Sequence, residues 1–130
     1  MLRQYFLDTN VIVRLLLEDS LEQLTIVKKY FQKAKEAKLR LKLPLFIIIE
    51  TAHVFRTFYG VPKEKICAQL IKIVSVPYLI IDDKMLVLEA LGLYKGSSAD
   101  FVDCILFATA SEQNAEVLSF DKDLKKLAKT

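Results

Sequence analysis

Three carboxylates each stand alone in a run of residues that carries no other acid, lysine or arginine. They are Asp8 in residues 4–13, Glu50 in residues 43–55 and Asp103 in residues 101–111. An ionised carboxylate is costly to bury among apolar side chains unless a positive group meets it. The sequence therefore predicts that either distant bases or a shared cation compensate these three acids.

A divalent cation is the simplest way to bring such acids together. Carboxylates that share a site without one repel each other, and at least one takes up a proton. The chain has one histidine, His53, and two well-separated cysteines, Cys67 and Cys104. This composition almost excludes a zinc site, and it excludes a Ser-His-Asp triad unless His53 serves it. Ligand sets made only of oxygen favour Mg²⁺ or Mn²⁺.

Strand-like and helix-like patterns alternate along the chain. Strands are expected at residues 4–7, 39–43, 76–81 and 117–120. Helices are expected at 11–17, 20–38, 44–59, 63–74, 83–94 and 98–113, with a short lysine-rich helix after Asp121. Ser20, Pro44, Ser98 and either Asp82 or Asp83 are the expected starts of four of them. This alternation predicts an α/β fold with a parallel sheet covered by helices on both faces.

The expected topology adds two acids to the candidate site. Asp8 and Asp121 each follow directly on a predicted strand, and parallel sheets bind ligands beyond the carboxyl ends of their strands. Asp121 also fits as the N-cap of the last helix. Asp100 lies three residues before Asp103 and shares its helix face, although it also fits as a capping partner of Ser97.

Composition and charge limit the class of protein. The chain has 130 residues, 53% of them hydrophobic, and a net charge of +3, which predicts one domain over residues 1–130 without linkers or repeats. The longest stretch free of acidic and basic residues, 73–81, is far shorter than the roughly 20 residues of a membrane helix. Asp8 interrupts any signal-peptide core. We therefore expect a protein of the cytoplasm that does not enter a membrane.

Four segments, taken together, resemble the PIN-domain family, and within it the small VapC-type toxins of toxin–antitoxin pairs. The segments are Asp8-Thr9-Asn10-Val11, Glu50 in its apolar helix, residues 103–110 and residues 118–124. The resemblance covers essentially the whole chain. It implies a three-layer α/β/α sandwich with a central parallel sheet and Mg²⁺- or Mn²⁺-dependent endonucleolytic cleavage of RNA.

The resemblance also implies roles for individual residues. Asp8, Glu50, Asp103 and Asp121 would be the acidic catalytic and metal-site residues, with Asn10 and Ser119 as supporting polar residues. A homodimer and an antitoxin protein that blocks the acidic cleft are further implications.

An acidic cleft repels RNA, so binding the substrate requires bases elsewhere. Arg14, just past Asp8, and Arg56, six residues beyond Glu50, are best placed to meet a phosphate near the metal. The basic segment 28–42 either tracks an RNA backbone or is a solvated helix face whose aromatic residues point into the core. If the four acids share one site, the remaining surface is more basic than the net charge indicates, as suits an enzyme that acts on a polyanion.

Three functions compete. The leading one is a metal-dependent ribonuclease, the toxin of a toxin–antitoxin pair. The second is a catalytically inactive PIN-like module that binds RNA or a protein. The third is another metal-dependent α/β phosphoesterase that acts on small substrates. His53, one turn beyond Glu50, is either a phosphate contact or an ordinary core or edge histidine.

Overall fold

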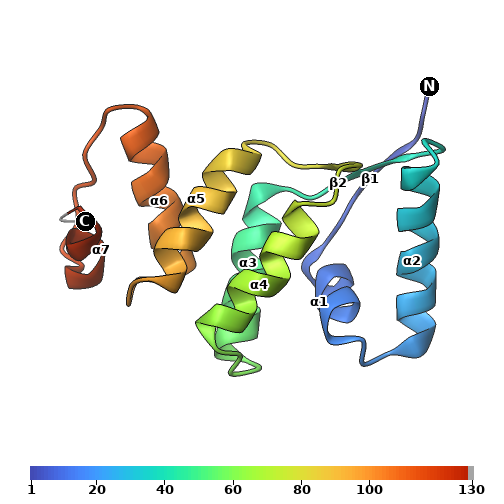
Figure 1. Ribbon diagram of the computed structural model, residues 1–130, viewed down its shortest axis with the longest axis horizontal. Coiled ribbons are helices and arrows are strands. Elements are labelled where there is room, and N and C mark those ends of the chain that lie inside the picture. Colours follow the sequence, from blue (N-terminus) through green and yellow to red (C-terminus); the bar gives the residue numbers. More distant parts are fainter. Residues whose placement is uncertain (129–130) are drawn as a thin grey trace.

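The computed structural model in Figure 1 describes residues 1–128, which form short parallel strands and longer helices. In chain order the elements are β1 (Gln4–Phe6), α1 (Thr9–Leu17), α2 (Leu21–Lys35), β2 (Arg40–Lys42), α3 (Leu45–Thr57), α4 (Lys63–Val74), β3 (Leu79–Ile80), α5 (Lys84–Lys95), α6 (Phe101–Glu112) and α7 (Lys122–Leu127). The parallel sheet and the helices between its strands confirm the predicted α/β class.

The sheet has the strand order β1-β2-β3, and both pairings are parallel. Because side chains alternate between the two faces of a strand, the sheet presents two rows. The row made by Tyr5, Leu41 and Leu79 packs against the core, where Leu41 is fully buried. The other row contains Phe6, which is 64% exposed, and Ile80. Within residues 1–128, this second row therefore faces solvent.

One continuous apolar core links the sheet to the helices. Helix α5 packs between α4 and α6, and Leu70, Leu91 and Cys104 are fully buried among them. Both cysteines are free and buried, as their apolar neighbours predict. Burial raises the pKa of the Cys104 thiol to about 11, so this group is protonated at neutral pH.

Several predicted helix starts are confirmed. The Ser20 side chain accepts a hydrogen bond from the Gln23 amide (3.4 Å) at the start of α2, and Asp121 accepts two at the start of α7. Pro44 precedes α3 in an extended conformation. It therefore occupies the cap position, one residue before the helical position expected for it.

Two other predicted caps differ from expectation. Asp83 holds the cap position before α5, but its backbone is left-handed (φ 52°) and its side chain makes no capping bond, while Asp82 pairs with Lys42 at 3.0 Å. Helix α6 starts at Phe101, so Asp100 rather than Ser98 holds the cap position. Ser98 instead donates a hydrogen bond to Asp123 (2.6 Å) in the last part of the chain. A distant acid thus competes successfully for this hydroxyl.

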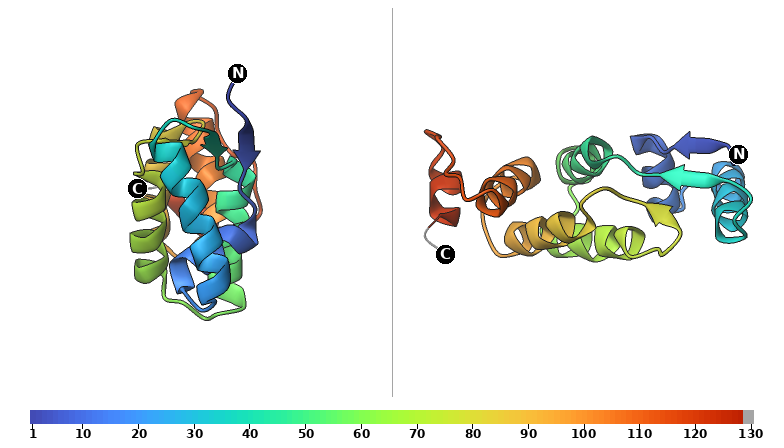
Figure 2. Two further views of the ribbon diagram at one scale, coloured as in Figure 1. Left: turned by 90° about the vertical axis from the view of Figure 1, so that its right-hand side faces the viewer. Right: turned by 90° about the horizontal axis from the view of Figure 1, so that it is seen from above.

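The predicted strand at 117–120 does not form, and the strand at 76–81 shortens to β3. The chain leaves α6 through a left-handed Asn114 (φ 55°). The Ala115 amide donates to the Ala110 carbonyl (2.8 Å) and the Asn114 amide donates to Ser111 (3.1 Å). This pair of bonds is a Schellman motif, which ends the helix. Residues 115–120 then run at the opposite end of the elongated molecule from the sheet, where none of the strands in the described residues lies beside them (Figures 1 and 2).

Within residues 1–128, no helix combines the length and the apolar character that crossing a membrane requires.

The end of α2 offers a direct test of the backbone geometry. Ala37 follows this helix with φ 60°, a conformation that costs an L-residue about 1 kcal/mol relative to glycine. We expect Ala37→Gly to raise the free energy of unfolding by up to about 1 kcal/mol. The matched change Ala68→Gly, on the exposed face of α4, should lower it by about 1 kcal/mol. Urea unfolding measures both, and a loss of stability in Ala37→Gly would contradict this geometry.

Candidate active site

Four aspartates gather where α6 and α7 begin, and we call them the α6–α7 acid cluster. They are Asp100, Asp103, Asp121 and Asp123. Asp103 is partly buried in the first turn of α6. Burial raises its pKa, and the charges of Asp121, Asp100 and Asp123 raise it further in that order. The structure thus brings three predicted site residues near one another. It adds Asp123, which the sequence marks only by its position two residues after Asp121.

Short hydrogen bonds fix the α7 side of this cluster. The Asp121 carboxylate accepts from the backbone amides of Asp123 (2.8 Å) and Leu124 (3.1 Å). The Ser119 hydroxyl accepts from the Asp121 amide (3.0 Å). Ser98 donates to Asp123 and ties the turn before α6 to α7. The N-terminal ends of two helices, which carry partial positive charge, therefore face the acids.

Lys63 holds the turn before α6 in place, a role the sequence does not indicate. Its Nζ donates to the carbonyls of Ser97 (2.9 Å) and Ala99 (2.8 Å) and lies 4.5 Å from the centroid of the Tyr94 ring. Tyr94 in turn packs edge-on against Phe101, the first residue of α6. As the first residue of a helix, Lys63 looks like an ordinary surface lysine in the sequence, and only the tertiary structure reveals its partners.

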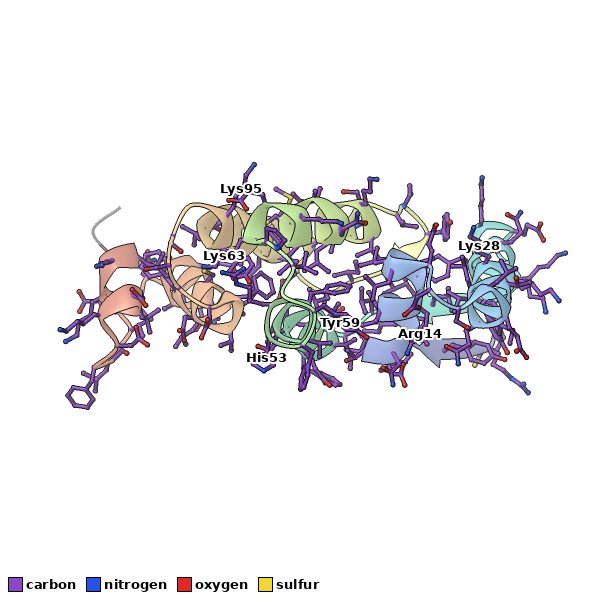
Figure 3. All side chains as sticks on the ribbon, turned by 90° about the horizontal axis from the view of Figure 1, so that it is seen from below. Arg14, Lys28, His53, Tyr59, Lys63 and Lys95 are labelled. Atoms are coloured by element: carbon purple, nitrogen blue, oxygen red, sulfur yellow. The ribbon has the colours of Figure 1, made fainter. Side chains whose placement is uncertain are left out.

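Glu50 and Arg56 project from α3 into a hollow of about 490 Å³ that Asp100 also lines. This volume lies in the usual range of ligand pockets. The Glu50 side chain is exposed, as is His53, which lines the same hollow (Figure 3). Arg56 also donates a hydrogen bond to the Val61 carbonyl (3.3 Å). The hollow thus holds a carboxylate from each of two helices and one guanidinium.

Asp8 lies in a different hollow, between α1 and α2, together with Asn10 and Arg14. Its carboxylate caps α1 by accepting from the Val11 amide (3.1 Å). Arg14 is ion-paired with Asp19 at 2.6 Å. Asp19 raises the pKa of Arg14, as does Tyr59 more weakly (Figure 3). The neighbouring Thr9 hydroxyl is buried and has no hydrogen-bond partner within residues 1–128.

The donor set and the geometry of one chain give different answers about a metal. Clustered carboxylates, with a raised pKa at Asp103, have the chemistry that a hard divalent cation stabilises. Over residues 1–128, however, no three histidine, cysteine, aspartate or glutamate side chains converge closely enough to hold one. Asp8 in particular shares its hollow with none of the other predicted acids.

The burial of the three lone acids also differs from what their apolar neighbours indicate. Only Asp103 is partly buried, while Asp8 and Glu50 are exposed. In α3 the flanking residues Ile48 and Thr51 fill the core, so the carboxylate between them points outward. The apolar run marks a buried helix side and not a buried charge.

The raised pKa of Asp103 predicts a pH-dependent stability. The folded state holds this proton more tightly than the unfolded chain does, so ionisation disfavours folding as the pH rises from about 3.9 through the raised pKa. In metal-free buffer, Asp103→Asn should therefore raise the free energy of unfolding at pH 7 and change it little below about pH 4. The control is Asp83→Asn, at an exposed carboxylate. Equal or lower stability of Asp103→Asn at pH 7 would contradict the raised pKa of Asp103.

Comparison with known proteins identifies the family. A curated relative, the VapC ribonuclease of Aquifex aeolicus (strain VF5), is 26% identical over 122 residues, which cover 93% of this chain and 90% of the relative. No solved structure matches the chain significantly. The family model described as PIN domain matches residues 5–130. The chain therefore belongs to the PIN domain family.

Proposed function

We propose that this protein is a Mg²⁺- or Mn²⁺-dependent endoribonuclease that hydrolyses RNA phosphodiester bonds. The observation that carries the proposal is the α6–α7 acid cluster, in which burial and then the charges of the other members raise the pKa of Asp103. The α3 hollow supports it, because Glu50 and Asp100 line that hollow together. Membership of the PIN domain family and the similarity to a VapC ribonuclease agree with this activity.

The four acids would have different roles in catalysis. Asp8, Glu50 and Asp103 would be the principal ligands of the cation, and Asp121 would complete the shell or orient the attacking water. A bound divalent cation supplies an activated water and relieves charge on the phosphoryl oxygens. Asn10 and Ser119 support Asp8 and Asp121 at neighbouring positions.

Two arginines are placed to meet the RNA backbone. Arg14 shares a hollow with Asp8, and Arg56 shares one with Glu50. Each would offset the repulsion between the acids and a phosphate. The part of the 28–42 segment that lies in α2 adds a second basic surface, made by the exposed side chains of Lys28, Lys29, Lys33 and Lys35. Its aromatic residues Tyr30 and Phe31 pack edge-on against Tyr5 and Tyr78, so the charges rather than the rings would contact RNA.

The finer assignments follow from the resemblance of the sequence to VapC-type toxins. We propose that the protein acts in the cytoplasm as the toxin of a toxin–antitoxin pair. It would work as a homodimer, and an antitoxin protein would block its acidic cleft.

A catalytically inactive module that binds RNA or protein is the second candidate. The observation that favours it is that, within residues 1–128, no three side chains able to bind a metal converge closely enough to hold one. The two candidates differ in one measurable property. The module would bind RNA equally well with or without divalent cations and would leave the RNA uncut.

The activity test uses substitutions that preserve the helix caps. Asparagine caps a helix as well as aspartate does, so Asp8→Asn keeps the bond to the Val11 amide while removing the charge. We expect Asp8→Asn and Asp103→Asn to lower Mn²⁺-dependent RNA cleavage by more than about 100-fold, beyond the loss typical of residues that only support a ligand.

The control variant is Asp83→Asn, which should cleave like the wild type. Thermal unfolding of each variant checks that the fold is intact. Wild-type cleavage by Asp8→Asn, or no cleavage by the wild type with either cation, would contradict the proposal.

A further inference from the structure

The outer edge of β1 is free. The Leu7 amide donates to the Lys42 carbonyl (2.9 Å), and the Arg3 carbonyl accepts from the Arg40 amide (3.0 Å). The odd-numbered residues of β1 thus direct their backbone groups toward β2. By the alternation of a parallel strand, Gln4 and Phe6 direct theirs toward the opposite edge, where the described chain places no strand. Such an edge is a template for a further strand.

Residues 115–120 have the complementary character. Leu118 is 98% exposed and Phe120 is 95% exposed, which is unusual for side chains of this size. They alternate with Val117 and Ser119, as in a strand that has one apolar face. This is the segment whose sequence predicts a strand, and its backbone is unpaired by any sheet within residues 1–128.

The segment is held away from the β1 of its own chain. Lys63 fixes the turn before α6 through Ser97 and Ala99. Buried Leu124 anchors α7 against α6 after the segment, and the Schellman motif at Asn114 fixes the chain before it. The segment therefore lies at one end of the elongated molecule and β1 at the other (Figures 1 and 2). A second copy of the chain can reach this edge without breaking these contacts.

We propose that residues 116–120 of one chain add as a parallel strand to the free edge of β1 in a second copy, and that the exchange is reciprocal in a closed dimer. The register that places Leu118 beside Tyr5 and Phe120 beside Leu7 adds both exposed side chains to the buried row of the sheet. Pairing of this kind satisfies the free backbone groups of Gln4 and Phe6, and symmetric exchange is an established route to dimers.

The same register has a consequence for the acids, which rests on the proposed function. Asp8 follows β1 directly and Asp121 follows the added strand directly, so the two meet at the carboxyl edge of the sheet. The Thr9 hydroxyl, buried without a partner, lies at this edge. The second copy would thus supply Asp103 and Asp121 to the Asp8 of the first. This explains why one chain alone leaves Asp8 apart from the α6–α7 acid cluster.

The test is a cross-link between two differently labelled chains and needs no catalytic activity. Gln4→Cys and Val117→Cys lie opposite each other in the proposed register. The native thiols do not compete, because Cys67 and Cys104 are buried. A size-tagged Gln4→Cys chain is co-refolded with an untagged Val117→Cys chain and mildly oxidised. We expect a disulfide-linked species that contains one chain of each kind.

Two controls decide between the alternatives. Replacing Val117→Cys by Glu112→Cys, on the exposed end of α6, should abolish the link. The double variant Gln4→Cys/Val117→Cys should link chains to each other and not within one chain. An internally linked monomer, or a monomeric mass of the wild type by sedimentation, would overturn the proposal.

A second measurement uses residues that the single chain leaves exposed. Leu118→Lys with Phe120→Lys cannot harm the packing of one chain, and it should convert the dimer into a folded monomer. An unchanged dimer mass in this variant would also overturn the proposal, whatever the outcome of the RNA cleavage assay.

Discussion

The backbone of a strand needs a neighbour, and in this molecule that requirement governs where the candidate site acids lie. Residues 115–120 carry the alternation of a strand but are carried away from the sheet by the Schellman motif at the end of α6. Because Asp121 follows this segment directly, the position of the segment decides whether Asp121 stays beside Asp103 alone or also reaches Asp8. Because the segment lies away from the sheet, the outer edge of β1 is free, and Leu118 and Phe120 face solvent.

The acid cluster itself depends on helix starts. Asp100 and Asp121 occupy the cap positions of α6 and α7, and Asp103 and Asp123 lie in the first turns. Helix N-termini stabilise negative charge, which allows several carboxylates to stand near each other. Burial, and after it the charges of Asp121, Asp100 and Asp123, still raise the pKa of Asp103. The remaining repulsion is what a divalent cation would remove.

Local signals in the sequence predict most of the elements. Helix α4 has the predicted bounds, and Ser20 and Asp121 cap their helices as expected. The predictions that are wrong depend on distant partners. Ser98 bonds to Asp123 in place of capping α6, and residues 117–120 form no strand because none lies beside them in the described residues. Of the predicted site residues, the structure brings Asp103, Asp121 and Asp100 near one another and leaves Asp8 in a different hollow. The sequence does not identify Asp123 or the hydrogen bonds from Lys63 to the turn before α6, because both depend on how α7 and α4 pack against that turn.

Subunit complementation tests the central claim most directly. When Asp8→Asn and Asp121→Asn chains are co-expressed, each mixed dimer with exchanged strands contains one site with both acids intact and one site with both replaced. Random pairing then predicts about a quarter of the wild-type RNA cleavage per chain, although each variant alone is inactive. If every chain builds its own site, each site retains one substitution and the mixture cleaves no faster than the separate variants, a result that would contradict the account.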